Sequence, residues 1–111
     1  MELSRQVRLC TLFDVYAPLL TTKQREVLHD YLENNLSLSE VAEVSASSRQ
    51  AVNDLLKRSI ASLEMYEEKL GFVAKLAGLR EQLSCSYLDF QNGKIDSQKL
   101  LSKIKKITED L

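Results

Sequence analysis

Five polar side chains of the kinds that bind DNA lie close together in the middle of this chain. They are Arg49, Gln50, Asn53, Lys57 and Arg58. Arginine can pair bidentately with guanine and glutamine or asparagine with adenine, while lysine and arginine suit phosphates. Any amphipathic helix has a polar face, but only Asp54 is acidic between Arg49 and Arg58. The set therefore favours a DNA-reading surface over a merely solvated one.

These side chains share one face only if the segment is helical. At about 100° per residue, Arg49, Gln50, Asn53 and Lys57 fall within roughly one quadrant of a helix. Val52, Leu55 and Leu56 lie on the opposite side. Ser48 precedes this periodicity and is the expected N-cap, and it completes the set of expected DNA contacts. A polar face at a helix N-terminus is what major-groove reading requires.

The segment "SLSEVAEVSASSRQAVNDLLKR", residues 37–58, has the outline of a helix-turn-helix. Ser37 and Glu40 form a capping box that predicts a short helix to about Val44. Two crossing helices need a small residue where they touch and apolar residues that lock them together. Ala42 and Val41 meet these needs in the first helix, and Val52 and Leu55 meet them in the second.

The turn departs from this pattern. Ser45, Ala46 and Ser47 stand where an apolar residue, a residue tolerant of positive φ and a second apolar residue are usual. Losing two buried apolar anchors would weaken the local packing by roughly 2 to 4 kcal/mol. We expect the turn to form nevertheless, because Ser48 caps the next helix and the apolar contacts on both sides remain.

The remaining sequence is typical of an all-α protein. Three Gly and one Pro among 111 residues exclude a turn-rich β-sandwich or barrel, and 44% hydrophobic residues suffice for a core. A capping box at Thr21 and Gln24 and a cap at Asp96 mark further helix starts. Expected helices run from about Arg5 to Tyr16, Thr22 to Glu33, Ser37 to Val44 and Ser48 to Leu70, with helical segments before Asn92-Gly93 and after Asp96. The period of the first helix is expected to bring one set of apolar residues near one face: Val7, Leu9, Leu12, Phe13, Tyr16 and Leu20.

Glycines indicate one internal boundary. Gly71 and Gly78 each weaken a helix by about 1 kcal/mol, so a break or bend is expected near one of them. The interpretation is a helix-turn-helix domain over residues 1–70, with its motif at about 37–58. A helical C-terminal extension over residues 71–111 would serve packing or oligomerisation.

The stretch "LFDVYAPLLTTKQREVLHDYLENNLSLSEVAEVSASSRQAVNDLLKR" also resembles the YlxM family of small bacterial proteins. The resemblance covers about Leu9 to Leu70. The residues that carry it are Leu12, Phe13, Tyr16, Leu19, Leu20, Thr21, Gln24, Arg25, Tyr31, Ser37, Leu38, Ser39, Glu40, Ala42, Ser48, Arg49, Gln50, Ala51, Val52, Glu64, Tyr66, Glu67, Lys69 and Leu70.

The resemblance implies a bundle similar to the region of sigma factors that reads the promoter −35 element, with a long recognition and connecting helix. It implies a cytoplasmic DNA-binding regulator with a suspected link to the signal recognition particle export pathway, since the family's genes commonly neighbour those of that particle. Ser45 and Ser47 depart from the aromatic residue and the valine common in the family, which puts the rigidity of the turn in question.

The sequence offers little for catalysis. His29, the only histidine, has no Cys partner at metal-ligand spacing, and no Gly-rich phosphate loop is present. We therefore expect no enzyme activity, no cofactor and no metal. Cys10 and Cys85 are far apart, and with no secretory signal they are expected to be reduced thiols in a cytosol. The run "LCTLFDVYAPLL" is interrupted by Asp14 and Pro18, so no membrane span is expected.

Two classes of partner remain open. A net charge of −1 means that DNA binding must come from a local basic patch. One short helix reads few bases, so a DNA reader is expected to be a homodimer or larger. The basic tail helix with its apolar stripe, residues 94–111, is expected to be an interface helix that packs on its own subunit or on a twin. The alternative for this helix is binding to anionic lipid, RNA or a partner. The acidic stretch from Glu26 to Glu43 favours the alternative, a protein- or ribonucleoprotein-binding module acting on a signal recognition particle component.

Overall fold

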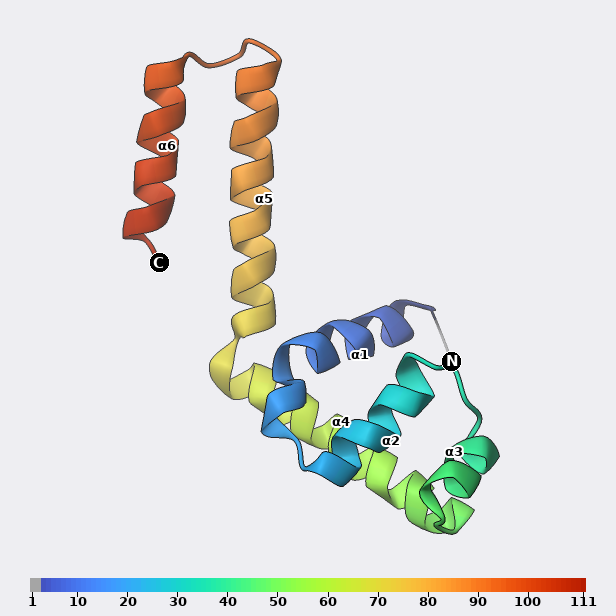
Figure 1. The fold of residues 1–111 in the computed structure, drawn as a ribbon. Helices are drawn as coiled ribbons and strands as arrows, with labels where there is room; N and C mark the ends of the chain where they lie inside the picture. The colour runs from blue at the N-terminus through green and yellow to red at the C-terminus, as the bar shows by residue number, and fades with distance from the viewer. Residues whose placement is uncertain (1–2) are drawn as a thin grey trace. The chain divides into compact units, whose positions relative to one another are not determined.

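The computed structural model describes residues 3–111, and these residues form helices and no strands (Figure 1). The all-α prediction is therefore confirmed. The elements are α1 (Leu3–Tyr16), the short 3-10 helix η1 (Ala17–Leu19), α2 (Thr22–Leu32), α3 (Leu38–Ser45), α4 (Arg49–Leu70), α5 (Phe72–Gln91) and α6 (Ser97–Glu109). They divide into two compact units, Met1–Val73 and Ala74–Leu111.

The predicted helix starts are confirmed by their side-chain caps. Thr21 accepts the Gln24 N–H while the Gln24 side chain accepts the Thr21 N–H, and Ser37 and Glu40 form the same reciprocal pair. Each box satisfies two backbone donors that a helix N-terminus would otherwise leave free. Asp96 caps α6 by accepting the Lys99 N–H at 2.8 Å.

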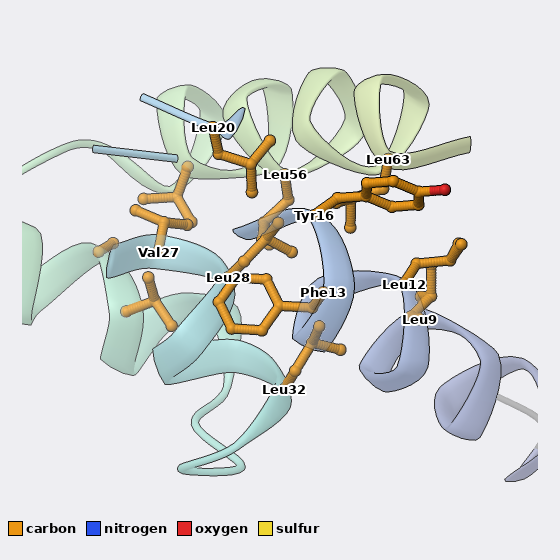
Figure 2. Packing of buried hydrophobic residues seen from close by; sticks show 13 residues of the cluster. Leu9, Leu12, Phe13, Tyr16, Leu20, Val27, Leu28, Leu32, Leu56 and Leu63 are labelled. Carbon is orange, nitrogen blue, oxygen red and sulfur yellow. The ribbon is translucent and has the colours of Figure 1, made fainter. Parts of the chain in front are cut away.

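The core of the first unit lies where α1 and α2 pack against α4 (Figure 2). Leu12, Leu28 and Leu63, one from each helix, are fully buried. The buried cluster comprises Leu9, Leu12, Phe13, Tyr16, Leu20, Val27, Leu28, Leu32, Val41, Ala42, Val52, Leu56 and Leu63. This burial holds α4 in place, so the polar residues at its N-terminal end are carried on a fixed helix.

One expected core residue lies outside this cluster. The sequence places Val7 on the apolar face of α1, but its side chain is 57% exposed. At about 100° per residue, Val7 lies roughly 160° around the helix from Leu9. The prediction was wrong because Leu9, Leu12, Phe13 and Tyr16 alone define the buried stripe of α1.

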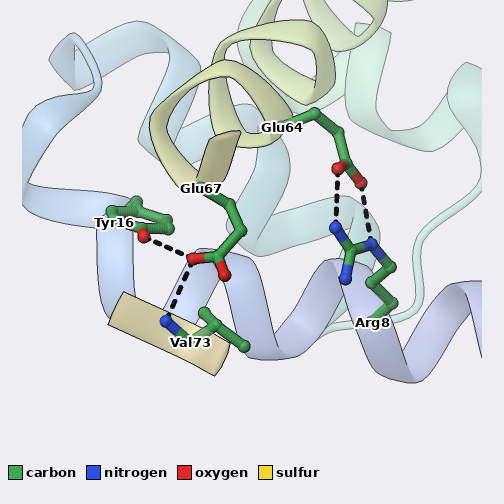
Figure 3. Close-up of polar contacts among 5 residues, drawn as sticks. All are labelled: Arg8, Tyr16, Glu64, Glu67 and Val73. Atoms are coloured by element: carbon green, nitrogen blue, oxygen red, sulfur yellow. Dashed lines mark hydrogen bonds and ion pairs between the residues drawn. The ribbon is translucent and has the colours of Figure 1, made fainter. Parts of the chain in front are cut away.

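Polar contacts tie α1 to the C-terminal half of α4 (Figure 3). Arg8 donates two hydrogen bonds to Glu64, at 2.8 and 3.1 Å, and this carboxylate raises the pKa of Arg8. Tyr16 Oη donates to Glu67 Oε1 at 2.5 Å, and the same carboxylate oxygen accepts the Val73 N–H at 3.0 Å. Burial and the Glu67 hydrogen bond raise the pKa of Tyr16.

The break between the two long helices falls at Gly71. This residue ends α4 with φ +66° in the left-handed region, which glycine adopts without a Cβ clash. Gly78, the other expected site of a break, lies inside α5.

The second unit is an antiparallel hairpin of α5 and α6 (Figure 1). Its turn is closed by hydrogen bonds from the Gly93 N–H to Phe90 O and from the Lys94 N–H to Asp89 O. An ion pair at 3.8 Å joins Lys103 of α6 to Asp89 of α5. Among the residues of this hairpin only Ser86 is buried.

Candidate nucleic-acid interface

The serine-rich turn between α3 and α4 is closed by its own backbone. Ala46 ends α3 with φ 55° and ψ 36°, the left-handed conformation usual for glycine. Its N–H donates to Glu43 O at 3.2 Å, and the Ser47 N–H donates to Ala42 O at 3.0 Å. These two bonds form the motif that commonly terminates helices. The prediction that residues 45–47 form the turn is therefore confirmed.

The two serine hydroxyls of the turn are satisfied locally. Ser45 Oγ donates to Ala42 O at 3.4 Å and Ser47 Oγ donates to Ser45 O at 3.3 Å. Both serines are half-buried. Hydrogen-bonded hydroxyls avoid the penalty of unpaired polar groups in a partly buried site. The turn thus replaces apolar anchors with short-range hydrogen bonds.

Apolar packing holds α3 and α4 together at the expected positions, with one adjustment. Val41 and Ala42 of α3 are buried, as is Val52 of α4. Leu55 is only partly buried, and Leu56 is the fully buried residue of that turn of α4. The side of α4 that faces the core is therefore rotated slightly from the expected one.

The expected DNA-binding residues lie on the first three turns of α4, except Ser48, which is its N-cap. Ser48 caps the helix by accepting the Ala51 N–H at 3.1 Å. Arg49, Gln50, Lys57 and Arg58 are exposed and Asn53 is half-buried. At about 1.5 Å per residue, Arg49 to Lys57 spans about 12 Å, which is close to the width of the DNA major groove.

The cations of this face are available for contact. Within the described part of the chain, no ion pair involves Arg49, Lys57 or Arg58. Gln50 is the exception among the exposed polar residues, because its Nε2 donates to Asp54 Oδ1 at 3.1 Å. Reading a base with Gln50 would require this exposed hydrogen bond to break.

Two further cations border this surface, and reasoning from the sequence missed both. Arg5 of α1 lines the same hollow as Asn53 and Lys57, a shallow space of about 200 Å³. Lys23 of α2 donates from Nζ to Ser45 O at 3.2 Å and so lies beside the turn. We define the basic face as Arg5, Lys23, Ser48, Arg49, Gln50, Asn53, Lys57 and Arg58.

No local signal in the sequence marks these two additions. Arg5 lies more than forty residues before Asn53 and reaches this hollow only because α1 packs on α4. Lys23 occupies the first turn of α2, a place where a cation is not favoured by that helix's own dipole. Its bond to Ser45 O instead places it at the C-terminus of α3, where a cation is stabilising.

Apart from Asp54, which accepts the Gln50 hydrogen bond, the nearby carboxylates lie outside the basic face. Glu40 is engaged in its capping box, where hydrogen bonds from Ser37 lower its pKa. Glu43 is exposed on α3. His29 lies on an exposed side of α2, 3.8 Å from Glu33. Over residues 3–111, no group of three His, Cys, Asp or Glu side chains is placed to hold a metal ion, and no helix is long and apolar enough to cross a membrane.

A short α3, a tight turn and a longer α4 with an exposed polar N-terminal face together define a helix-turn-helix protein. The family comparison agrees, because residues 3–107 match the model described as "UPF0122: Putative helix-turn-helix protein, YlxM / p13 like". The chain belongs to this family, which confirms the resemblance seen in the sequence.

Curated members of the family are similar over more than half of this chain. A UPF0122 protein of Symbiobacterium thermophilum is 48% identical over 68 residues, which cover 61% of this chain and 64% of that protein. One from Fusobacterium nucleatum is 43% identical over 83 residues, 75% of this chain and 81% of the relative. One from Caldanaerobacter subterraneus is 55% identical over 64 residues, 58% and 55% of the two chains. The chain thus spans less than two thirds of two of these relatives.

Proposed function

We propose that this protein binds double-stranded DNA, with the first three turns of α4 in the major groove. The observation that carries the proposal is the set of unpaired cations on that exposed helix end. Arg49, Lys57 and Arg58 lie beside Gln50 and Asn53 on a helix that buried residues hold in place. An exposed cluster of cations and amides without neutralising partners fits an anionic ligand that presents hydrogen-bonding edges.

Different parts of the basic face have different roles in this proposal. Arg49 and Gln50, at the tip of α4, read base edges, and Asn53 supports them from the next turn. Lys57 and Arg58 bind phosphates, as do Lys23 and Arg5 at the border of the face. The N-terminal dipole of α4 adds a favourable field for a phosphate near Ser48.

A selection experiment tests this proposal. The purified protein is used to enrich fragments from a genomic DNA pool, and binding of an enriched fragment is followed by fluorescence anisotropy. Arg49→Ala with Gln50→Ala is expected to abolish the preference for the enriched fragment. Lys69→Ala, an exposed cation at the other end of α4, is the matched control and should bind like the wild type. No enrichment, or full binding by the double variant, would overturn the proposal.

The reader is proposed to act as a homodimer in a bacterial regulatory role. A face of about 12 Å covers only about three or four base pairs at 3.4 Å per step, which is too little for useful specificity. Two copies that read two half-sites would double the number of base contacts.

The alternative is a protein- or ribonucleoprotein-binding module that acts on a signal recognition particle component. The acidic outer side of α2 and α3 favours it, because exposed Glu26, Glu40 and Glu43 oppose close phosphate approach there. Val44, 67% exposed on α3, adds an apolar contact beside them. Salt titrations with enriched DNA and with signal recognition particle RNA and protein, run side by side, separate the two functions. Binding to a particle component that is insensitive to Arg49 and Gln50 substitution would favour the alternative.

A further inference from the structure

The α5–α6 hairpin has one side on which its two helices meet. Asp89 of α5 pairs with Lys103 of α6. Gln82 and Ser86 of α5 line a hollow together with residues of α6 that include Ile107. On α5, these residues mark the side that faces α6.

The apolar stripe of α5 does not lie on that side. Leu76, Leu83, Tyr87 and Phe90 repeat at intervals of seven, four and three residues, so they share one helix face. At about 100° per residue, the centre of this stripe is rotated by roughly 100° from the side that faces α6. The four side chains are 53, 43, 63 and 44% exposed.

The apolar residues of α6 lie on the same side of the hairpin. Leu101 and Ile104, 65 and 41% exposed, are rotated by roughly 120° from the α6 residues that face α5. In both helices, the rotation from the side that faces the other helix to the apolar stripe has the same sense. It is the sense in which residue numbers increase around the helix axis. Because the helices are antiparallel (Figure 1), equal rotations bring both stripes to one side. We name this surface, Leu76, Leu83, Tyr87, Phe90, Leu101 and Ile104, the hairpin face.

The hairpin lacks an interior of its own. Residues 74–111 form a compact unit in which only Ser86 is buried. Units shorter than about 40 residues usually need a disulfide, a metal or oligomerisation to be stable. Cys85 is a free thiol, and no metal-binding group of side chains occurs among the described residues. Association is the stabilising route that remains.

We propose that the hairpin face binds the hairpin face of a second copy of this chain, forming an antiparallel four-helix bundle. The exposed fractions above correspond to roughly 500–600 Å² per copy, taking about 180 Å² for a large apolar side chain. Two faces therefore bury about 1,100 Å², which reaches the lower bound for a specific interface. A two-helix face with two parallel apolar stripes is self-complementary, as a two-fold dimer requires. Tyr87 and Phe90 supply the aromatic contacts that such interfaces favour.

This inference gives the proposed DNA reader a specific dimer interface, but it does not need DNA to be tested. Its failure and that of the DNA proposal are distinguishable, since the oligomeric state is measured on the protein alone. A monomer that still binds DNA would overturn only the dimer, and a dimer that binds no DNA would overturn only the DNA reader.

Sedimentation equilibrium of the full chain tests the hairpin face. The wild type is expected to be a dimer at tens of micromolar, and Leu83→Lys and Tyr87→Lys should each weaken it roughly 100-fold or more, since each change removes two apolar contacts per dimer. Leu88→Lys is the matched control, because Leu88 is 50% exposed but lies roughly 130° around α5 from the centre of the stripe. It should remain dimeric.

A cross-linking measurement avoids disruptive substitutions. In a Cys85→Ser background, Leu83→Cys lies near the middle of α5 and should be joined to its partner by a short bismaleimide, whereas Leu88→Cys should not. A monomeric wild type would overturn the proposal, as would equal cross-linking at the two positions. An unchanged mass with a lower melting temperature in Leu83→Lys would show that the face packs on its own chain, and that would overturn it too.

Discussion

Replacing Ala46 by glycine is expected to stabilise the helix-turn-helix. Ala46 has φ 55° and ψ 36°, where a residue with a Cβ is disfavoured by about 1–2 kcal/mol relative to glycine. Glycine in turn loses about 0.5–1 kcal/mol more backbone entropy on folding. The difference predicts that Ala46→Gly raises the free energy of unfolding by about 0.5–1 kcal/mol.

Urea titration followed by helical circular dichroism measures this change. Ala61 supplies the matched control, because it is exposed in the interior of α4. Ala61→Gly is the same chemical change in a right-handed helix and should lower the free energy of unfolding by about 1 kcal/mol. The two variants are thus expected to shift in opposite directions. Equal destabilisation by both would refute the left-handed turn at Ala46.

Three further predictions concern the first unit. Leu63 is fully buried, so Leu63→Ala should lower the free energy of unfolding by about 2–5 kcal/mol, measured in urea, and a loss below 1 kcal/mol would contradict the core described here. Hydrogen bonds from Ser37 lower the pKa of Glu40 in the folded protein. The folded state is therefore fully stabilised by these bonds above the unfolded-state pKa of Glu40, and this stabilisation disappears as the pH falls through the lower folded-state pKa. Thermal unfolding of the wild type and Glu40→Gln should therefore converge once the pH has fallen below the lowered pKa of Glu40, and a difference that stays constant throughout acid titration would argue against this bond. Arg8 and Glu64 are half exposed, so Arg8→Met should lower the free energy of unfolding by at most about 1 kcal/mol. Salt at 1 M should reduce this loss. A larger loss that persists in salt would show that packing, and not the ion pair, is responsible.

The sequence predicts the helix starts well because capping is local chemistry. Ser37 and Glu40 satisfy each other's backbone donors across three residues, so the pattern and the structure carry the same information. The same holds for Thr21 with Gln24. Periodicity was less reliable near the start of α1, where an apolar residue, Val7, lies on the exposed side.

The basic face was only partly predictable. Arg49, Gln50, Asn53 and Lys57 share a quadrant of one helix, and helix geometry alone brings them together. Arg5 joins them through the packing of α1 on α4, a contact between distant segments that no local pattern encodes.

The turn was predictable in position but not in mechanism. Its serines depart from the usual apolar pattern, yet Ser45 and Ser47 each find a backbone carbonyl within 3.5 Å. Whether a serine hydroxyl in a turn is satisfied depends on backbone geometry, which composition does not reveal.

The salt dependence of DNA binding, measured for paired variants, tests the central proposal most directly. Association with an enriched fragment and with a scrambled fragment is measured from 50 to 300 mM salt. Arg49→Ala should weaken only the enriched fragment, by about 1–3 kcal/mol. Arg58→Ala should weaken both fragments alike and reduce the slope of log K against log salt by about 0.9. If Arg49→Ala leaves the ratio of the two affinities unchanged, the tip of α4 does not read DNA and the proposed function is wrong.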